Sequence, residues 1–256
     1  MKYATQKRML LAALLSLCTY SAAAPAPQQD HPDLTKMTVS ELEKTGDQAR
    51  AQKNYFFAID CFKAGIGKDR KNAVLYNKLG LSQLKANDLS AARNNFEKAS
   101  KLNPKFADAV NNVGAVDYMR KQYGKSAKNF KKAVALEETR ATFHVNLGAA
   151  WFSQKKMERA MAEYTRAMEL DPDAFRTESK TGIAAQIASP EERAQYSYLL
   201  AKAYAKRGDV EGCLQCLKKA KEDGYRNMNN VYKDEEFSQL RGNPKLHEVV
   251  PPPVVK

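Results

Sequence analysis

Four glycines recur along this sequence at a constant spacing of 34 residues. Each is followed by a small residue after twelve positions, an aromatic residue after sixteen and another small residue after nineteen. The glycines and their aromatic residues are Gly46, Gly80, Gly114 and Gly148, with Phe62, Phe96, Phe130 and Tyr164. A fixed period of roughly 20–50 residues is the signature of stacked structural repeats, so this spacing restricts the fold more than any other feature.

The pattern inside each unit predicts a pair of helices. A glycine in the first helix costs about 1 kcal/mol relative to alanine, and close approach of a neighbouring helix offsets that cost. On the second helix the small, aromatic and small residues are spaced by four and three, so they share one face. A single helix pair cannot bury such a face, and we therefore expect neighbouring pairs to stack.

This pattern resembles the tetratricopeptide repeat family, and the resemblance covers residues 39–174 as four tandem repeats. It implies an all-α, right-handed superhelical solenoid of antiparallel helix pairs. Gln83 and Asp117 depart from the family, because a large apolar residue is usual at their positions. The stretch from Asp234 to Lys245 is similar to the end of many secreted bacterial tetratricopeptide proteins.

The first 23 residues indicate a secretory signal peptide, with a basic start, an apolar run over 9–17 and small residues up to Ala23. We expect cleavage after Ala23, a flexible leader over 24–37, and an exported protein, periplasmic or secreted, without stable membrane insertion. Two alternatives stay open. Lipidation at Cys18 is disfavoured by Leu17 before it, and an uncleaved N-terminal anchor is the other.

The period is interrupted after Pro172, and Pro190 would break any helix running through this region. Ala201 then takes the glycine's place in a further repeat. We expect an insertion, a fifth repeat, a helical cap and a proline-rich tail at 175–190, 191–225, 226–250 and 251–256. The cap is expected to cover the apolar end of the stack, as solenoids require.

Candidate catalytic residues are few. The only histidines are His31, His144 and His247, and none has a metal-ligand neighbour four residues away. No phosphate-binding loop, zinc-protease motif or nucleophile elbow occurs. We therefore expect no enzyme activity, no metal and no cofactor, with His144 in the core or at the edge of a groove.

Three cysteines remain after residue 23: Cys61, Cys213 and Cys216. The last two have the spacing of a redox motif, but reactive cysteines of that kind lie at a helix N-terminus, where the thiol pKa is lowered. Here Cys213 is expected inside a helix at a packed position. We expect structural cysteines, while an intrahelical disulfide and a redox site remain alternatives.

The formal charge is +13, or +10 without Lys2, Lys7 and Arg8, which permits an anionic partner. Lysines spaced by four, three and four face away from the expected core on the second helix of the third repeat: Lys121, Lys125, Lys128 and Lys132. We interpret them as a solvated outer face. Aromatic residues do not alternate with them as a base-stacking surface requires, and we predict no nucleic-acid partner.

In this family the first helices line a concave surface that often binds peptides. The resemblance implies such a groove here, with amides for a peptide backbone and rings as apolar anchors. The candidate residues are Asn77, Lys78, Asn111, Asn112, Tyr118, Asn146 and Phe152. We expect Asn112 and Asn146 to face solvent, so that replacing both would weaken binding with little loss of stability.

Together these patterns predict an exported adaptor or scaffold that binds a protein or peptide. The alternative is a non-catalytic accessory subunit of an envelope enzyme complex. The sequence determines neither the partner nor the oligomeric state.

Overall fold

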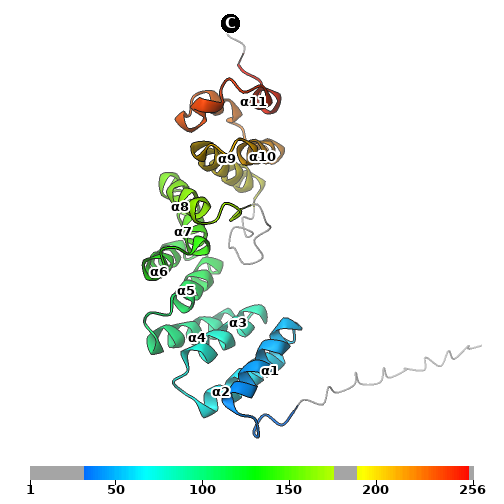
Figure 1. The fold of residues 1–256 in the computed structure, drawn as a ribbon, viewed down its shortest axis with the longest axis vertical. Helices are drawn as coiled ribbons and strands as arrows, with labels where there is room; N and C mark the ends of the chain where they lie inside the picture. Colours follow the sequence, from blue (N-terminus) through cyan, green and yellow to red (C-terminus); the bar gives the residue numbers. More distant parts are fainter. Residues whose placement is uncertain (1–31, 176–188, 254–256) are drawn as a thin grey trace, which may run out of the picture. The chain divides into compact units, whose positions relative to one another are not determined.

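A computed structural model describes residues 32–175 and 189–253. The predicted signal peptide, most of the leader and insertion, and the end of the tail lie outside these residues. Eight helices occupy 39–170, each first helix of a pair having 13 residues and each second helix 14 (Figure 1). They are α1 (Val39–Ala51), α2 (Tyr55–Lys68), α3 (Ala73–Lys85), α4 (Leu89–Leu102), α5 (Ala107–Met119), α6 (Tyr123–Leu136), α7 (Ala141–Ser153) and α8 (Met157–Leu170).

A fifth pair and a terminal segment follow. They are α9 (Pro190–Arg207), α10 (Val210–Glu222), η2 (Met228–Tyr232), η3 (Glu235–Leu240) and α11 (Pro244–Val249). From α1 to α10 each helix packs chiefly on its neighbours in the chain, and η3 packs on α9. No strand occurs in 32–175 or 189–253. The fold is the expected all-α solenoid of antiparallel helix pairs. At its start, Thr38 and Glu41 form the predicted capping box on α1.

The turn inside each pair has the same backbone geometry. Residues with left-handed φ values near 60° lie seven positions after each repeat glycine: Lys53, Asn87, Lys121 and Lys155. In the fifth pair Gly208 has a φ of 80° and lies seven positions after Ala201. The turn therefore gives Ala201 the same place in its pair as the repeat glycines.

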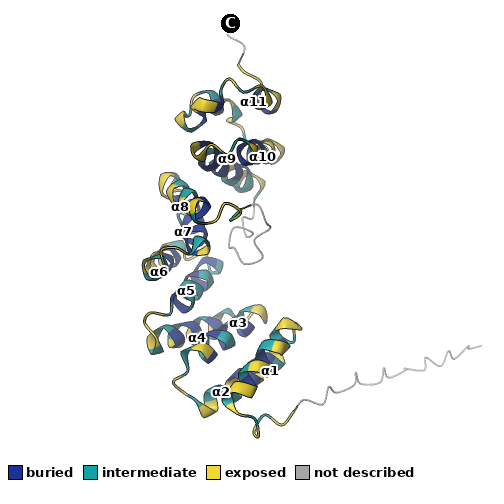
Figure 2. Cartoon of the chain, viewed as in Figure 1, coloured by how far each residue is buried: buried dark blue, intermediate teal, exposed yellow. Residues whose placement is uncertain are grey.

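The repeat glycines lie directly under the aromatic rings of their own pairs. A Cβ atom at Gly80 would lie 2.6 Å from the ring of Phe96, and one at Gly114 would lie 2.7 Å from that of Phe130. Both rings are fully buried. Figure 2 shows buried residues along the helices of the stack. The glycine thus lets the two helices of one pair close on each other.

The two residues that depart from the family pattern, Gln83 and Asp117, are buried polar residues with hydrogen-bond partners. Gln83 accepts a hydrogen bond from Asn95 Nδ2 (2.7 Å), twelve residues later in the same pair. Asp117, which is 0% exposed, accepts from Asn129 Nδ2 (2.9 Å), again twelve residues later. Arg93 of the preceding pair donates to the other oxygen of Asp117 (2.8 Å). The side-chain oxygens of Gln83 and Asp117 are therefore all paired, as their desolvation requires.

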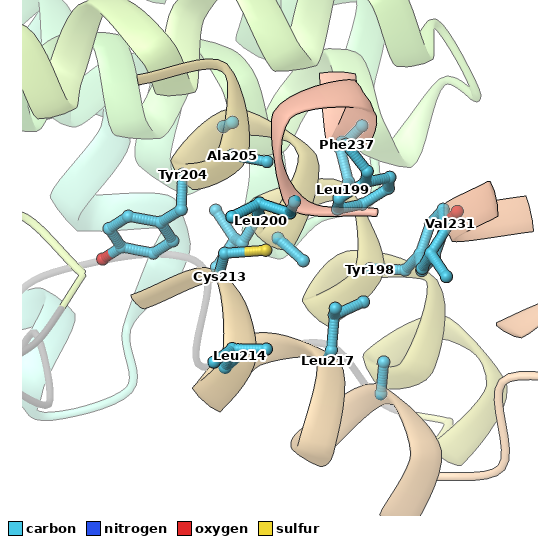
Figure 3. Close-up of a cluster of buried hydrophobic side chains, with 14 of the residues drawn as sticks. Tyr198, Leu199, Leu200, Tyr204, Ala205, Cys213, Leu214, Leu217, Val231 and Phe237 are labelled. Atoms are coloured by element: carbon cyan, nitrogen blue, oxygen red, sulfur yellow. The ribbon is translucent and has the colours of Figure 1, made fainter. Parts of the chain in front are cut away.

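The C-terminal segment packs on the fifth pair. One apolar cluster joins residues of α8, α9 and α10 to Val231, Phe237, Leu240 and Leu246 (Figure 3). In this pair the ring is on the first helix and the glycine is on the second, the reverse of the earlier pairs. Gly212 on α10 lies under Tyr204 on α9, and a Cβ atom at Gly212 would lie 2.8 Å from that ring. The end of the stack is thus covered by the chain itself.

Candidate functional site

Four asparagines lie on three successive first helices, and we call them the amide row: Asn77, Asn111, Asn112 and Asn146. Asn112 Nδ2 donates to Asn77 Oδ1 (2.9 Å). Asn146 Nδ2 donates to Asn111 Oδ1 (3.0 Å). Each bond joins residues 35 apart, one repeat plus one residue, so the amide row links α3 to α5 and α5 to α7.

The expectation that Asn112 and Asn146 face solvent is wrong. Asn146 is only 5% exposed, and Asn112 is partly buried. Because both side chains bridge successive repeats, replacing them must change stability as well as any binding. Sequence reasoning missed this because it compared residues 34 apart and not 35.

Lys78 was expected to offer its ammonium group to a ligand, but it already has two carboxylate partners. Its Nζ lies 2.6 Å from Glu43 Oε1 and 2.5 Å from Asp47 Oδ2, both on α1. Burial lowers the pKa of Lys78, but hydrogen bonds to Asp47 and Glu43 outweigh it and raise the pKa overall. The ammonium group stays charged and links α1 to α3, with Glu43 at the same 35-residue spacing and Asp47 one helical turn later on α1.

The two predicted aromatic anchors belong to the core. Tyr118 and Phe152 are both buried. The hydroxyl of Tyr118 lies 2.9 Å from Ser153 Oγ, once more 35 residues away. The ring of Phe152 meets Tyr196 of α9 edge-on, with centroids 5.6 Å apart. Neither ring offers a free apolar face to a ligand.

Other apolar side chains do flank the amide row. Val74 and Leu81 lie three residues before and four after Asn77 on α3, so they share its helix face. Val74 is 43% exposed and Leu81 is partly buried. Ala115, four residues after Asn111, is also partly buried. The sequence signal for these positions was their helical spacing from the asparagines.

A comparable link joins the first helix α9 to the terminal segment, where Asp234 is the N-cap of η3. Tyr198 and Lys202 stand in α9 where Glu43 and Asp47 stand in α1, three before and one after the residue at the glycine position. Tyr198 donates to Asp234 Oδ2 (2.9 Å), and Lys202 Nζ lies 3.3 Å from the same oxygen. The charges are thus reversed relative to the Lys78 link.

His144 is hydrogen-bonded to neighbouring residues, Cys213 is buried and Cys216 is partly buried. The two ring nitrogens of His144 face Glu163 Oε2 (2.7 Å) and the carbonyl oxygen of Glu138 (3.0 Å). Cys213 and Cys216 are free thiols, and burial raises the pKa of each to about 12. Such thiols are poor nucleophiles. Over 32–175 and 189–253 no group of three acidic, His or Cys side chains is placed to hold a metal ion.

A stack of helix pairs joined by cross-links between first helices defines a helical repeat protein. Residues 77–136 and 118–175 match the model of the tetratricopeptide repeat (TPR) family. Residues 77–175 are therefore tetratricopeptide repeats. Among the helices of the chain in the described ranges, none is long and apolar enough to cross a membrane.

Solved TPR structures have a similar fold. MamA from Desulfovibrio magneticus RS-1 is 18% identical, with a TM-score of 0.52 over 72% of this chain and 93% of its own. TTC0263 from Thermus thermophilus is 16% identical, with a TM-score of 0.51 over 77% and 96%. YrrB, described as a TPR protein with an unusual peptide-binding site, is 17% identical, with 0.50 over 75% and 90%. No curated protein sequence matches the chain significantly.

Proposed function

We propose that this chain is a non-catalytic scaffold that holds an extended segment of a partner protein on the face of its first helices. The observation that carries the proposal is the amide row beside an exposed apolar side chain, Val74. Each hydrogen bond of the amide row uses the oxygen of one asparagine and the nitrogen of the other. The opposite end of each carboxamide is outside that bond and suits a peptide group, which has one donor and one acceptor.

Further support comes from the chemistry of single atoms. Asn146 Oδ1 is buried without a hydrogen-bond partner among the described residues. An unpaired buried acceptor costs roughly 1–3 kcal/mol, and a donor from a bound segment would recover that free energy. Val74 and Leu81 would take apolar side chains of the same segment. First helices line the concave side in this family, and YrrB is described as having a peptide-binding site.

The decisive experiment compares the two exposed large hydrophobic residues of the described chain. Val74 lies on the proposed face, whereas Phe56, 75% exposed, lies on the second helix α2. A pull-down from the envelope fraction would supply a partner, and calorimetry would give its affinity. We expect Val74→Asp to weaken binding roughly tenfold or more, since an apolar contact is lost and a carboxylate is desolvated. Phe56→Asp should bind as the unchanged protein does.

Neither replacement removes a buried side chain, so folding should persist in both, which circular dichroism would check. Loss of binding in Phe56→Asp alone would place the partner on the second helices and contradict the proposal. If the captured partner is an envelope enzyme, its activity with and without the chain would show whether the chain is an accessory subunit.

We also propose that the protein is exported. The support is the basic start, apolar run and small residues over 1–23. Mass spectrometry of the protein recovered from cells should find an N-terminus at Ala24 and no acyl group on Cys18. An intact N-terminus at Met1 in the recovered protein would contradict cleavage, and an acylated Cys18 would indicate a membrane-tethered protein.

A further inference from the structure

The outer face of α6 differs from every other second helix in its charge. Five lysines lie between residues 121 and 136, a stretch without any acidic residue: Lys121, Lys125, Lys128, Lys131 and Lys132. All five are exposed. None forms an ion pair with another residue of 32–175 or 189–253. Lys121 lies in the turn before α6 and the other four lie on the helix; we call this set the α6 lysine face.

At two positions of this face, the counterpart in a neighbouring pair has an ion-pair partner. Lys131 corresponds to Glu97 of α4, which pairs with Arg93 (2.6 Å). Lys132 corresponds to Arg166 of α8, which pairs with Glu169 (3.0 Å). Lys98 of α4, which also corresponds to Lys132, is an exposed lysine without an ion pair in the described residues, so the third repeat differs in the number of such lysines that it carries.

The geometry of this face suits a broad, flat partner. At 100° per residue, Lys125, Lys128 and Lys132 fall within about 60° of arc and span roughly 10 Å along the helix. The exposed residues beside them, Gly124 and Ala135, are small, and a Cβ atom at Gly124 would have no neighbour within 4 Å. Nothing bulky holds the helix away from a surface that approaches it.

We propose that the α6 lysine face adsorbs to an anionic phospholipid surface. Lysine ammonium groups are point charges on flexible stems, which suits the diffuse charge of a lipid headgroup layer, whereas bidentate phosphate recognition favours arginine. The aromatic residues of α6, Tyr123 and Phe130, pack against the core, so no ring is left to stack on bases. No exposed bulky apolar side chain lies among the lysines, so the contact is electrostatic adsorption without insertion.

Vesicle co-sedimentation of the full chain tests this proposal. One variant carries Lys125→Gln, Lys128→Gln, Lys131→Gln and Lys132→Gln. Its control removes the same charge from exposed lysines of α4 and α10, as Lys98→Gln, Lys101→Gln, Lys218→Gln and Lys219→Gln. The vesicles contain phosphatidylcholine with or without phosphatidylglycerol. Binding to the neutral vesicles measures the background from the N-terminal apolar run, which all variants share.

The unchanged protein should prefer anionic vesicles and lose that preference in high salt. A lysine near an anionic bilayer strengthens partitioning about fivefold, so the α6 variant, which lacks four lysines, should bind up to about 600-fold more weakly. The control should retain clearly more binding than the α6 variant. If the two variants lost equal amounts of vesicle binding, net charge alone would explain the loss and the proposal would be overturned. Binding to duplex DNA or polyglutamate through α6 with no preference for anionic vesicles would also overturn it.

Discussion

At the scale of single residues, a missing side chain decides whether a pair can close. We predict that Gly80→Ala destabilises the protein by roughly 1–3 kcal/mol, because the new Cβ atom would lie 2.6 Å from the buried ring of Phe96. Gly67→Ala is the matched control, since a Cβ atom there has nothing within 4 Å. It should be neutral or stabilise by up to about 1 kcal/mol. Chemical denaturation measures both, and equal effects would contradict this account.

A second prediction at this scale concerns His144. Both of its ring nitrogens face oxygen acceptors, and only the imidazolium ion can donate to both. The hydrogen bond to Glu163 raises the pKa of His144 against the opposing effect of burial, with a smaller rise from the Glu138 carbonyl. Because the folded pKa exceeds the unfolded value of about 6.5, the stabilisation is complete below that pH. It is lost as the pH rises through the folded pKa.

Denaturation curves from mildly acidic to mildly alkaline pH would show this fall in the free energy of unfolding. His144→Gln should remove it. Glu163→Gln should reduce it, since the partner then carries no charge. A slope that persists unchanged in His144→Gln would assign the pH dependence to another group.

At the scale of elements, the first helices are cross-linked by side chains one repeat plus one residue apart. We predict that Asn111 and Asn146 are energetically coupled. Asn146→Ala leaves Asn111 Oδ1 without its donor, which should cost roughly 1–3 kcal/mol. In a double-mutant cycle with Asn111→Ala, the coupling free energy should be about 1 kcal/mol. Strict additivity of the two losses would show that the hydrogen bond does not join α5 to α7 in solution.

Much of the element scale could be predicted from the sequence. The period of 34 predicted the helix pairs and a close helix approach at each glycine. The structure adds that the close contact is the ring of the same pair, and it recurs with the period because it lies within one pair. The links between pairs were missed, since their spacing of 35 becomes visible only once two first helices are aligned side by side. Tyr118 and Phe152 were misplaced for a related reason. Both rings pack on the next pair, and spacing within one helix does not reveal that contact.

At the scale of the whole chain, the order of helix pairs followed from the sequence, but the electrostatic differences between pairs did not. Lys78 forms ion pairs with two carboxylates of the preceding helix pair. Asp117 likewise forms an ion pair with Arg93 of the pair before it. Such partners cannot be found by comparing each repeat with a consensus, because they are absent from the other repeats. They are also where the repeats stop being equivalent.

The energetic difference between repeats can be measured by deleting one repeat at a time and comparing the stabilities of the shortened chains. Removing 107–140 would set Asn77 opposite Asn146, and an amide pair would form again. Removing 73–106 would set Glu43 opposite Asn112 and would leave the buried carboxylate of Asp117 without Arg93. An unpaired buried charge costs roughly 3–5 kcal/mol, so the second shortened chain should be the less stable by about that amount in chemical denaturation. Similar stabilities for the two would contradict the argument.

The cross-links between first helices therefore limit how a protein of this kind can change its length. Duplication or recombination of whole repeats preserves the backbone stack wherever the chain is joined in phase. It preserves stability only where each side chain finds a compatible partner in its new neighbour. Amide pairs are compatible with one another in any order, whereas a carboxylate needs its lysine or arginine, so new copies of a repeat are most readily accepted along the amide row.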